Sequence, residues 1–240
     1  MSVIKTLLIT GENNHDWRRT SSFCKNLLER TGFFQVDVTE NPARDLADTA
    51  SLSNYHLFFL DYNGPDWGEP AKSNLEAAVH DGAGLVVLHA ANNAFPDWVA
   101  YEKMIGLAWR EGAGHGEFHK FKVEITEHDH PVTQGLQDFE TWDELYHGLM
   151  HMHQAPYQVL ARAYSDPKTG GTGQDEPIII VLEYGRGRVF HLMLGHVWPG
   201  DANGSYRGAS LIALENEGFQ SALKRGCAWA ATGAIRDEQR

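Results

Sequence analysis

The chain has 240 residues, of which 42% are hydrophobic and 22% are charged, as is ordinary for a globular protein with a sizeable core. Its formal net charge of −12 argues against binding to nucleic acid or to an anionic membrane surface, because both kinds of binding need lysine and arginine to neutralise phosphates. No apolar run approaches the roughly 20 residues that cross a bilayer, and the amino terminus has no cleavable signal pattern, so we expect a cytoplasmic protein.

The first half of the chain alternates between strand and helix patterns. Short apolar runs predict strands at residues 4–10, 34–39, 57–62 and 84–88, and helices are expected from Thr20 to near Gly32 and from Pro70 to His80. This order predicts a doubly wound parallel sheet.

The second half is richer in strands. Extended patterns cover residues 119–126, 157–164, 177–184 and 188–193, the last two joined by the hairpin signal Gly185-Arg186-Gly187, and a closing helix is expected over 214–231. Since no domain boundary is evident, we predict one α/β domain over residues 1–240.

Five sequence segments, taken together, carry a family resemblance. They are GENNHDW at 11–17, LHAANNAF at 88–95, HDHPVTQGL at 128–136, DELY at 143–146 and the stretch from GRGRVF at 185–190 to Gly195-His196. In this order the chain resembles the ThuA (trehalose utilisation) family over nearly its whole length. The resemblance implies a flavodoxin-like, class I glutamine amidotransferase-like three-layer sandwich with a mainly parallel sheet.

The resemblance also places a tight strand-to-helix turn after residues 84–88. His89 then takes the position that the amidotransferases give to cysteine. The chain contains no Gly-x-Cys-x-Gly, and its two cysteines, Cys24 and Cys227, fall in the predicted first and last helices. Because glutaminase chemistry needs an activated thiolate, the protein is not expected to be a glutaminase.

Three residues are the candidates for catalysis. His89 and His196 follow strands at the edge where open α/β sheets bind ligands. Glu144 has aromatic neighbours in the sequence, and if they bury its carboxyl, the pKa of that carboxyl is raised. The resemblance supports all three as proton-transfer groups. The alternatives are histidines that are merely hydrogen-bonded under the loops and a carboxylate paired with an arginine.

A second set of residues is expected to bind the substrate. The set is His15, Tyr62, Asn63, Trp67, Asn92, His119 and Arg207. Some have plain structural alternatives: tryptophans are more often in the core, Arg207 could pair with Glu215, and Asp61 beside this set could cap its own turn. In His115-Gly116-Glu117-Phe118-His119, a metal site and a solvated loop are both possible, and the resemblance favours His119 over His115.

The resemblance and the three proton-transfer candidates together imply an enzyme of carbohydrate catabolism that binds a small carbohydrate and acts on it by His/Glu acid–base chemistry. The family's association implies trehalose-derived or related glycosides in keto form, supplied by a separate NAD-dependent sugar dehydrogenase; a homodimer is possible. One alternative is a hydrolase, lyase or isomerase with a divalent metal such as zinc on His15, His89, Glu144 and His196. Another is a sugar-binding domain without catalysis.

Overall fold

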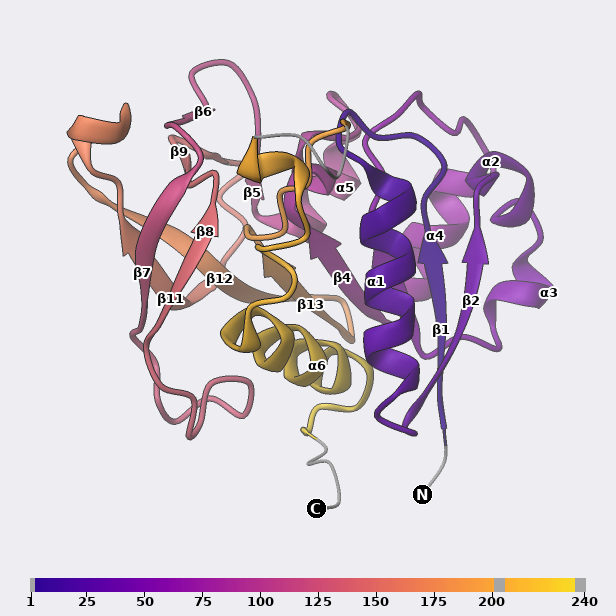
Figure 1. The fold of residues 1–240 in the computed structure, drawn as a ribbon. Coiled ribbons are helices and arrows are strands. Elements are labelled where there is room, and N and C mark those ends of the chain that lie inside the picture. Colours follow the sequence, from indigo (N-terminus) through magenta and orange to yellow (C-terminus); the bar gives the residue numbers. More distant parts are fainter. Residues whose placement is uncertain (1–2, 201–205, 236–240) are drawn as a thin grey trace.

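A computed structural model describes residues 3–200 and 206–235 (Figure 1). The strands are β1 (Ile4–Ile9), β2 (Phe34–Thr39), β3 (Leu57–Leu60), β4 (Gly84–Leu88), β5 (Leu107–Ala108), β6 (Gly114–His115), β7 (His119–Ile125), β8 (Phe139–Asp143), β9 (Tyr146–His147), β10 (Met150–His151), β11 (Gln158–Tyr164), β12 (Asp175–Tyr184) and β13 (Gly187–Leu192). The α-helices are α1 (Trp17–Glu29), α2 (Pro42–Asp45), α3 (Thr49–Leu52), α4 (Ala71–His80), α5 (Val99–Ile105) and α6 (Glu217–Thr232). Short 3₁₀ turns are η1 (His89–Asn93), η2 (Pro167–Thr169) and η3 (Arg207–Ala209).

A nine-stranded sheet in the order β2-β1-β3-β4-β13-β12-β11-β7-β8 forms the centre of the fold. The first five strands in this order run parallel, and each later strand is antiparallel to its neighbour. Because the antiparallel half alternates in direction, β8 and β11 run the same way as β13. The carboxyl ends of β1, β3, β4, β13 and β8 therefore lie along one edge of the sheet.

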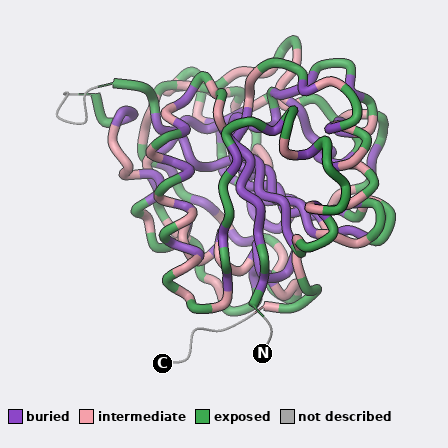
Figure 2. Tube along the Cα trace, turned by 90° about the vertical axis from the view of Figure 1, so that its right-hand side faces the viewer, coloured by how far each residue is buried: buried purple, intermediate pink, exposed green. Residues whose placement is uncertain are grey.

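Helices cover both faces of the sheet and enclose two apolar cores. Helices α1 and α6 cover one face, and α4 and α5 lie behind the sheet on the other (Figure 1). Strands β3 and β4 are buried throughout because their apolar side chains enter both cores. Figure 2 shows the buried strands running through the middle of the molecule. In the described part of the chain, no helix is both long and apolar enough to span a membrane.

The predicted three-layer α/β fold is confirmed, with differences at the ends of elements and in short strands. Helix α1 begins at Trp17 and not at Thr20, because the Asp16 carboxylate accepts a hydrogen bond from the Arg19 N–H and caps it. Helix α6 begins at Glu217 because Asn216 caps it in the same way. Strand β8, helices α2, α3 and α5, and the two-residue strands were not predicted.

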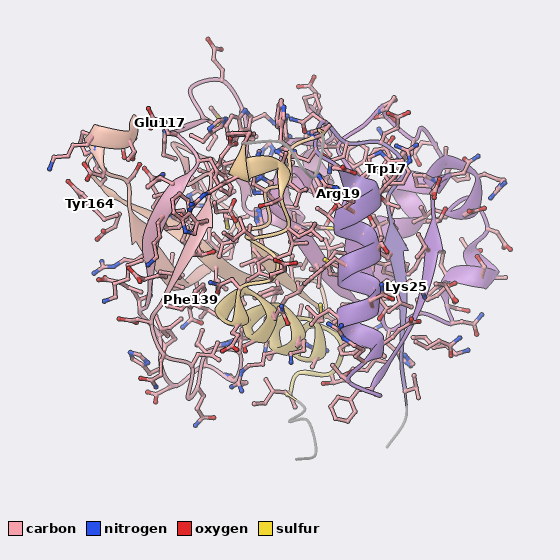
Figure 3. The ribbon with its side chains drawn as sticks, viewed as in Figure 1. Trp17, Arg19, Lys25, Glu117, Phe139 and Tyr164 are labelled. Atoms are coloured by element: carbon pink, nitrogen blue, oxygen red, sulfur yellow. The ribbon has the colours of Figure 1, made fainter. Side chains whose placement is uncertain are left out.

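The buried carboxylate of Asp61 links the start of α1 to the end of β3. Its Oδ2 accepts hydrogen bonds from the hydroxyls of Thr20 and Ser21, at 2.5 and 2.7 Å, and its Oδ1 accepts one from the Asn13 amide at 3.2 Å. Asp61 therefore does not cap its own turn, which was the simpler expectation. Figure 3 shows Trp17 and Arg19 at this end of α1, with Lys25 farther along the helix.

Burial raises the pKa of Asp61 to about 6, against the opposing effect of these hydrogen bonds. An acid whose pKa rises on folding stabilises the fold below its unfolded pKa, about 3.9, and loses that contribution as the pH rises through the folded value. We expect the free energy of unfolding of the natural protein, relative to Asp61→Asn, to fall by roughly 2 kcal/mol between pH 4 and pH 7. Urea unfolding at several pH values measures this difference. The exposed Asp129→Asn is the control, and a difference for Asp61→Asn that stays constant with pH would contradict the account.

Candidate active site

Four segments bring buried polar side chains to the carboxyl edge of the sheet. His15 lies in the loop after β1, His89 directly follows β4, His196 lies four residues after β13, and Glu144 directly follows β8. Each of the four residues is less than 10% exposed. The topology explains the convergence, because the strands that precede these residues all end at this edge.

The side chains of His15, His196 and Glu144 meet at hydrogen-bonding distances, and the His89 ring lies beside them. His15 Nε2 lies 3.0 Å from His196 Nδ1, and Glu144 Oε2 lies 3.1 Å from the same Nδ1. One ring nitrogen from each of His15, His89 and His196 lies within 4.8 Å of the others. The three imidazoles (the histidine cluster) therefore form one assembly with the Glu144 carboxylate.

The backbone at His89 adopts the tight turn that the family resemblance implies. His89 has a φ of 45°, a left-handed conformation that is rare for a residue other than glycine, and it opens the 3₁₀ turn η1. Such conformations persist where the surrounding structure fixes them, often at functional sites. Here the ring is held by Nδ1, which lies 2.7 Å from the Met193 carbonyl oxygen.

The surroundings fix the tautomers of two of the rings. His89 Nδ1 faces a carbonyl oxygen, and His15 Nδ1 lies 3.0 Å from Asn14 Oδ1 and 3.3 Å from Asn13 Oδ1. Since all three partners are acceptors, each Nδ1 carries the proton and each Nε2 presents a lone pair. The lone pair of His89 accepts a hydrogen bond from the Tyr146 hydroxyl at 2.8 Å.

Crowding and burial keep the histidine cluster neutral. Burial lowers the pKa of His15 to about 4, with a further contribution from His115. Burial and the neighbouring histidines hold the pKa values of His89 and His196 well below the usual range. Burial has the opposite effect on Glu144 and raises its pKa, although His115 and the Tyr206 hydroxyl oppose the rise.

Two residues that the sequence analysis did not select complete the assembly. The buried Asp143 accepts hydrogen bonds from the backbone N–H groups of Glu144, Gly195 and His196, at 2.8, 2.8 and 3.2 Å, and so joins the end of β8 to the segment after β13. Tyr146 stacks on His89 with ring centroids 4.2 Å apart. Both residues stand in the DELY motif, which was the available signal.

A cavity of about 150 Å³ opens beside this assembly. Its lining residues are Asn14, His15, Asn63, Ala90, Asn93, Trp109, His115, Glu144, Tyr146 and Trp198. A larger cavity of about 510 Å³ lies between α3 and α4 and contains none of the clustered groups. The chemistry therefore points to the smaller cavity.

Of the residues expected to bind the substrate, His15 and Asn63 line this cavity and five do not. Tyr62 and Trp67 are buried with Phe95 in an aromatic cluster of the core. The side chain of Asn92 turns into the core toward His191, and the neighbouring Asn93 faces the cavity instead.

The preference for His119 over His115 is also not reflected in the geometry. His119 Nδ1 faces the Glu117 carbonyl oxygen at 2.6 Å, outside the cavity, whereas His115 lines the cavity with Nε2 3.4 Å from Glu144 Oε2. Arg207 lies outside too, with its guanidinium over the Trp142 ring at 4.4 Å. His115 and His119 therefore do not face one common site, because residues 116–118 between β6 and β7 do not continue as a strand.

Comparison with known proteins agrees with this architecture. A family model described as ThuA, trehalose utilisation, matches residues 5–230. The chain belongs to the ThuA family. A ThuA-like protein from Parabacteroides merdae is 33% identical, with a TM-score of 0.85 over 99% of this chain and 93% of that one.

More distant structures share the fold alone. A ThuA-like protein from Bacteroides uniformis is 18% identical, with a TM-score of 0.70 over 98% of this chain and 95% of that one. A β-galactosidase from Bacillus circulans is 12% identical, with a TM-score of 0.58 over 98% of this chain and 32% of that one. No curated protein was found to match the chain in sequence.

A buried ion pair supports the cavity wall of this ThuA protein. Arg110 Nε donates to Glu102 Oε1 at 2.9 Å, and the side chains are only 13% and 5% exposed. The same guanidinium donates to the carbonyl oxygens of Asn93 and Trp109, two residues of the wall. Burial alone would raise the pKa of Glu102, but hydrogen bonds from His153 and Arg110 outweigh it and hold the pKa low.

Removing the Arg110 cation leaves the buried Glu102 carboxylate with the His153 ring but without its permanently charged partner. We expect Arg110→Met to lower the free energy of unfolding by about 3–5 kcal/mol, as for other buried pairs that lose one member. Arg44→Met is the matched control: its side chain is 72% exposed and pairs with Asp45, so its loss should leave the free energy of unfolding nearly unchanged. Equal losses for the two variants in urea unfolding would show that the buried pair does not support the wall.

Proposed function

We propose that this ThuA protein is a metal-dependent enzyme of carbohydrate catabolism. In this proposal the histidine cluster holds a divalent metal such as zinc, and Glu144 transfers a proton. The observation that carries the proposal is the convergence of three neutral imidazole nitrogens within 4.8 Å of one another, with a carboxylate beside them.

The donor set fits a zinc-type ion. Zinc–nitrogen bonds of 2.0–2.1 Å at tetrahedral angles place ligand nitrogens roughly 3.3 Å apart, close to the 3.0 Å between His15 Nε2 and His196 Nδ1. The Nδ1 protons of His15 and His89 face oxygen acceptors, as is usual for histidines that bind metals through Nε2. A metal would replace the Tyr146 hydroxyl as the partner of the His89 Nε2 lone pair.

The position of His196 adds a second argument for the metal. Its Nδ1 faces both the lone pair of His15 Nε2 and the Glu144 carboxylate, and a single N–H group cannot donate fully to both. Its Nε2 is buried without a hydrogen-bond partner among the described atoms. Strongly lowered pKa values make His89 and His196 poor carriers of a proton, so the ligand role suits them better than the acid–base role expected from the sequence.

Glu144 has the properties of a general base. Its carboxylate lines the cavity, and the pKa raised by burial brings it closer to neutral pH, where a base is most effective. A bound metal would supply Lewis-acid polarisation of a substrate oxygen. In a keto-glycoside, the carbonyl acidifies the neighbouring C–H, and Glu144 would accept that proton; enolisation, epimerisation or loss of the glycosidic leaving group can follow.

The sugar substrate of the proposal comes from the family's description, trehalose utilisation. A keto-glycoside would be formed by oxidation of a sugar hydroxyl, the reaction of an NAD-dependent dehydrogenase, which is the proposed functional partner. The loops that line the cavity contribute asparagine, histidine and carboxylate side chains, the groups that hydrogen-bond to sugar hydroxyls.

Metal analysis and turnover of a keto-glycoside test the proposal together. We expect about one equivalent of metal in the natural protein and less than about a tenth of an equivalent in His89→Ala and His196→Ala. Glu144→Gln should keep its metal and lose about 10²–10⁴-fold in turnover, the usual contribution of a general base. The exposed His128→Ala is the control and should match the natural protein in both measurements.

Two outcomes contradict the proposal in different ways. A natural protein that takes up no zinc, cobalt or manganese on dialysis has no metal site. A metal-loaded protein that binds a keto-glycoside but turns over none would be a sugar-binding domain.

A further inference from the structure

The volume of the cavity limits what can enter it. At about 150 Å³ the space is smaller than the roughly 300–1,000 Å³ of sites that enclose drug-sized ligands. An apolar cavity of about 150 Å³ accommodates a single benzene ring. The cavity therefore has room for one six-membered ring, with substituents directed at the walls and the mouth.

The walls combine amide groups with aromatic rings. Asn14, Asn63 and Asn93 come from the loops after β1, β3 and β4, and each amide offers both donors and an acceptor. Trp109 and Trp198 provide indole rings from two further segments. A pyranose ring needs this combination, because its rim carries hydroxyl groups and its faces carry C–H groups.

Trp198 is unusual because it lies against the histidine cluster and yet remains accessible. Its ring is stacked on His196, with an interplanar angle of 11° and centroids 5.7 Å apart, and the residue is 44% exposed. Its backbone N–H donates to the Gly208 carbonyl oxygen at 2.7 Å, which fixes the segment that carries it. An exposed, positioned indole beside polar groups is available to cover a ligand ring.

A hydrogen-bond chain connects the amide wall to the histidine cluster. Asn14 Oδ1 accepts from Asn63 Nδ2 at 2.7 Å and from His15 Nδ1 at 3.0 Å. The Asn63 backbone N–H donates to the Glu12 carbonyl oxygen at 2.9 Å, so the two loops are joined. A hydroxyl bound by these amides would lie within two hydrogen bonds of the His15 ring.

From these observations we propose that the cavity binds one monosaccharide ring, with Trp198 and Asn63 as specificity-determining residues. A disaccharide such as trehalose enters with one ring, and its second ring stays outside in solvent. This inference rests on the proposed function for the sugar class, but it depends on the cavity's size and walls and not on catalysis.

Calorimetric titration of zinc-loaded protein with glucose, methyl α-glucoside and trehalose tests the inference. We expect methyl α-glucoside and trehalose to bind within about threefold of each other, because the second ring adds no enclosed contact. Trp198→Ala and Asn63→Ala should each weaken binding of methyl α-glucoside at least about tenfold, with their metal content unchanged. Trp142→Ala, outside the cavity, and the exposed Asn54→Ala are the matched controls.

The outcomes separate this inference from the proposed function. If the natural protein binds trehalose more than about thirtyfold tighter than methyl α-glucoside, the site encloses two rings and the inference is overturned. Zinc-loaded protein that binds none of the three sugars would also overturn it while leaving the metal site intact. Sugar binding by a protein that takes up no metal would support the inference and contradict the proposed function.

Discussion

The site depends on one constraint: three imidazole rings lie close together in a buried space, and this favours the neutral form of each ring. Burial disfavours the imidazolium form, and each neighbouring ring would repel a second positive charge. The rings are therefore held as neutral lone-pair donors. Rings of this kind are poor proton donors near neutral pH, but their lone pairs are suited to binding a metal ion.

The fold creates this crowding through strand direction. The parallel strands β1, β4 and β13 end at the same edge of the sheet, where His15, His89 and His196 follow them. Because direction alternates in the antiparallel half, β8 also ends at that edge, where Glu144 follows it. Asp143 then joins the two halves, because its carboxylate accepts hydrogen bonds from backbone N–H groups after β8 and after β13. The antiparallel extension of the sheet thus adds the carboxylate that contacts His196.

Apolar strand patterns and chain order were sufficient to predict the parallel half of the sheet and the convergence of His15, His89 and His196, whereas the choice of Glu144 rested on the family resemblance. The sequence could not resolve single-residue choices in the loops. Asn92 and Asn93 are adjacent in a 3₁₀ turn, and only the packing of the turn against His191 decides which one faces the cavity. Strand β8 was not predicted because FETWD is mostly polar and lies at the edge of the sheet. The core position of Trp67 depends on its contact with Phe95, which comes from a distant segment.

The most direct measurement of the central claim is a crystal structure with anomalous scattering recorded at the zinc edge. The account predicts one strong anomalous peak with nitrogens of His15, His89 and His196 at about 2.0–2.1 Å. A peak elsewhere on the molecule, or zinc-soaked crystals with no peak among these three rings, would contradict it.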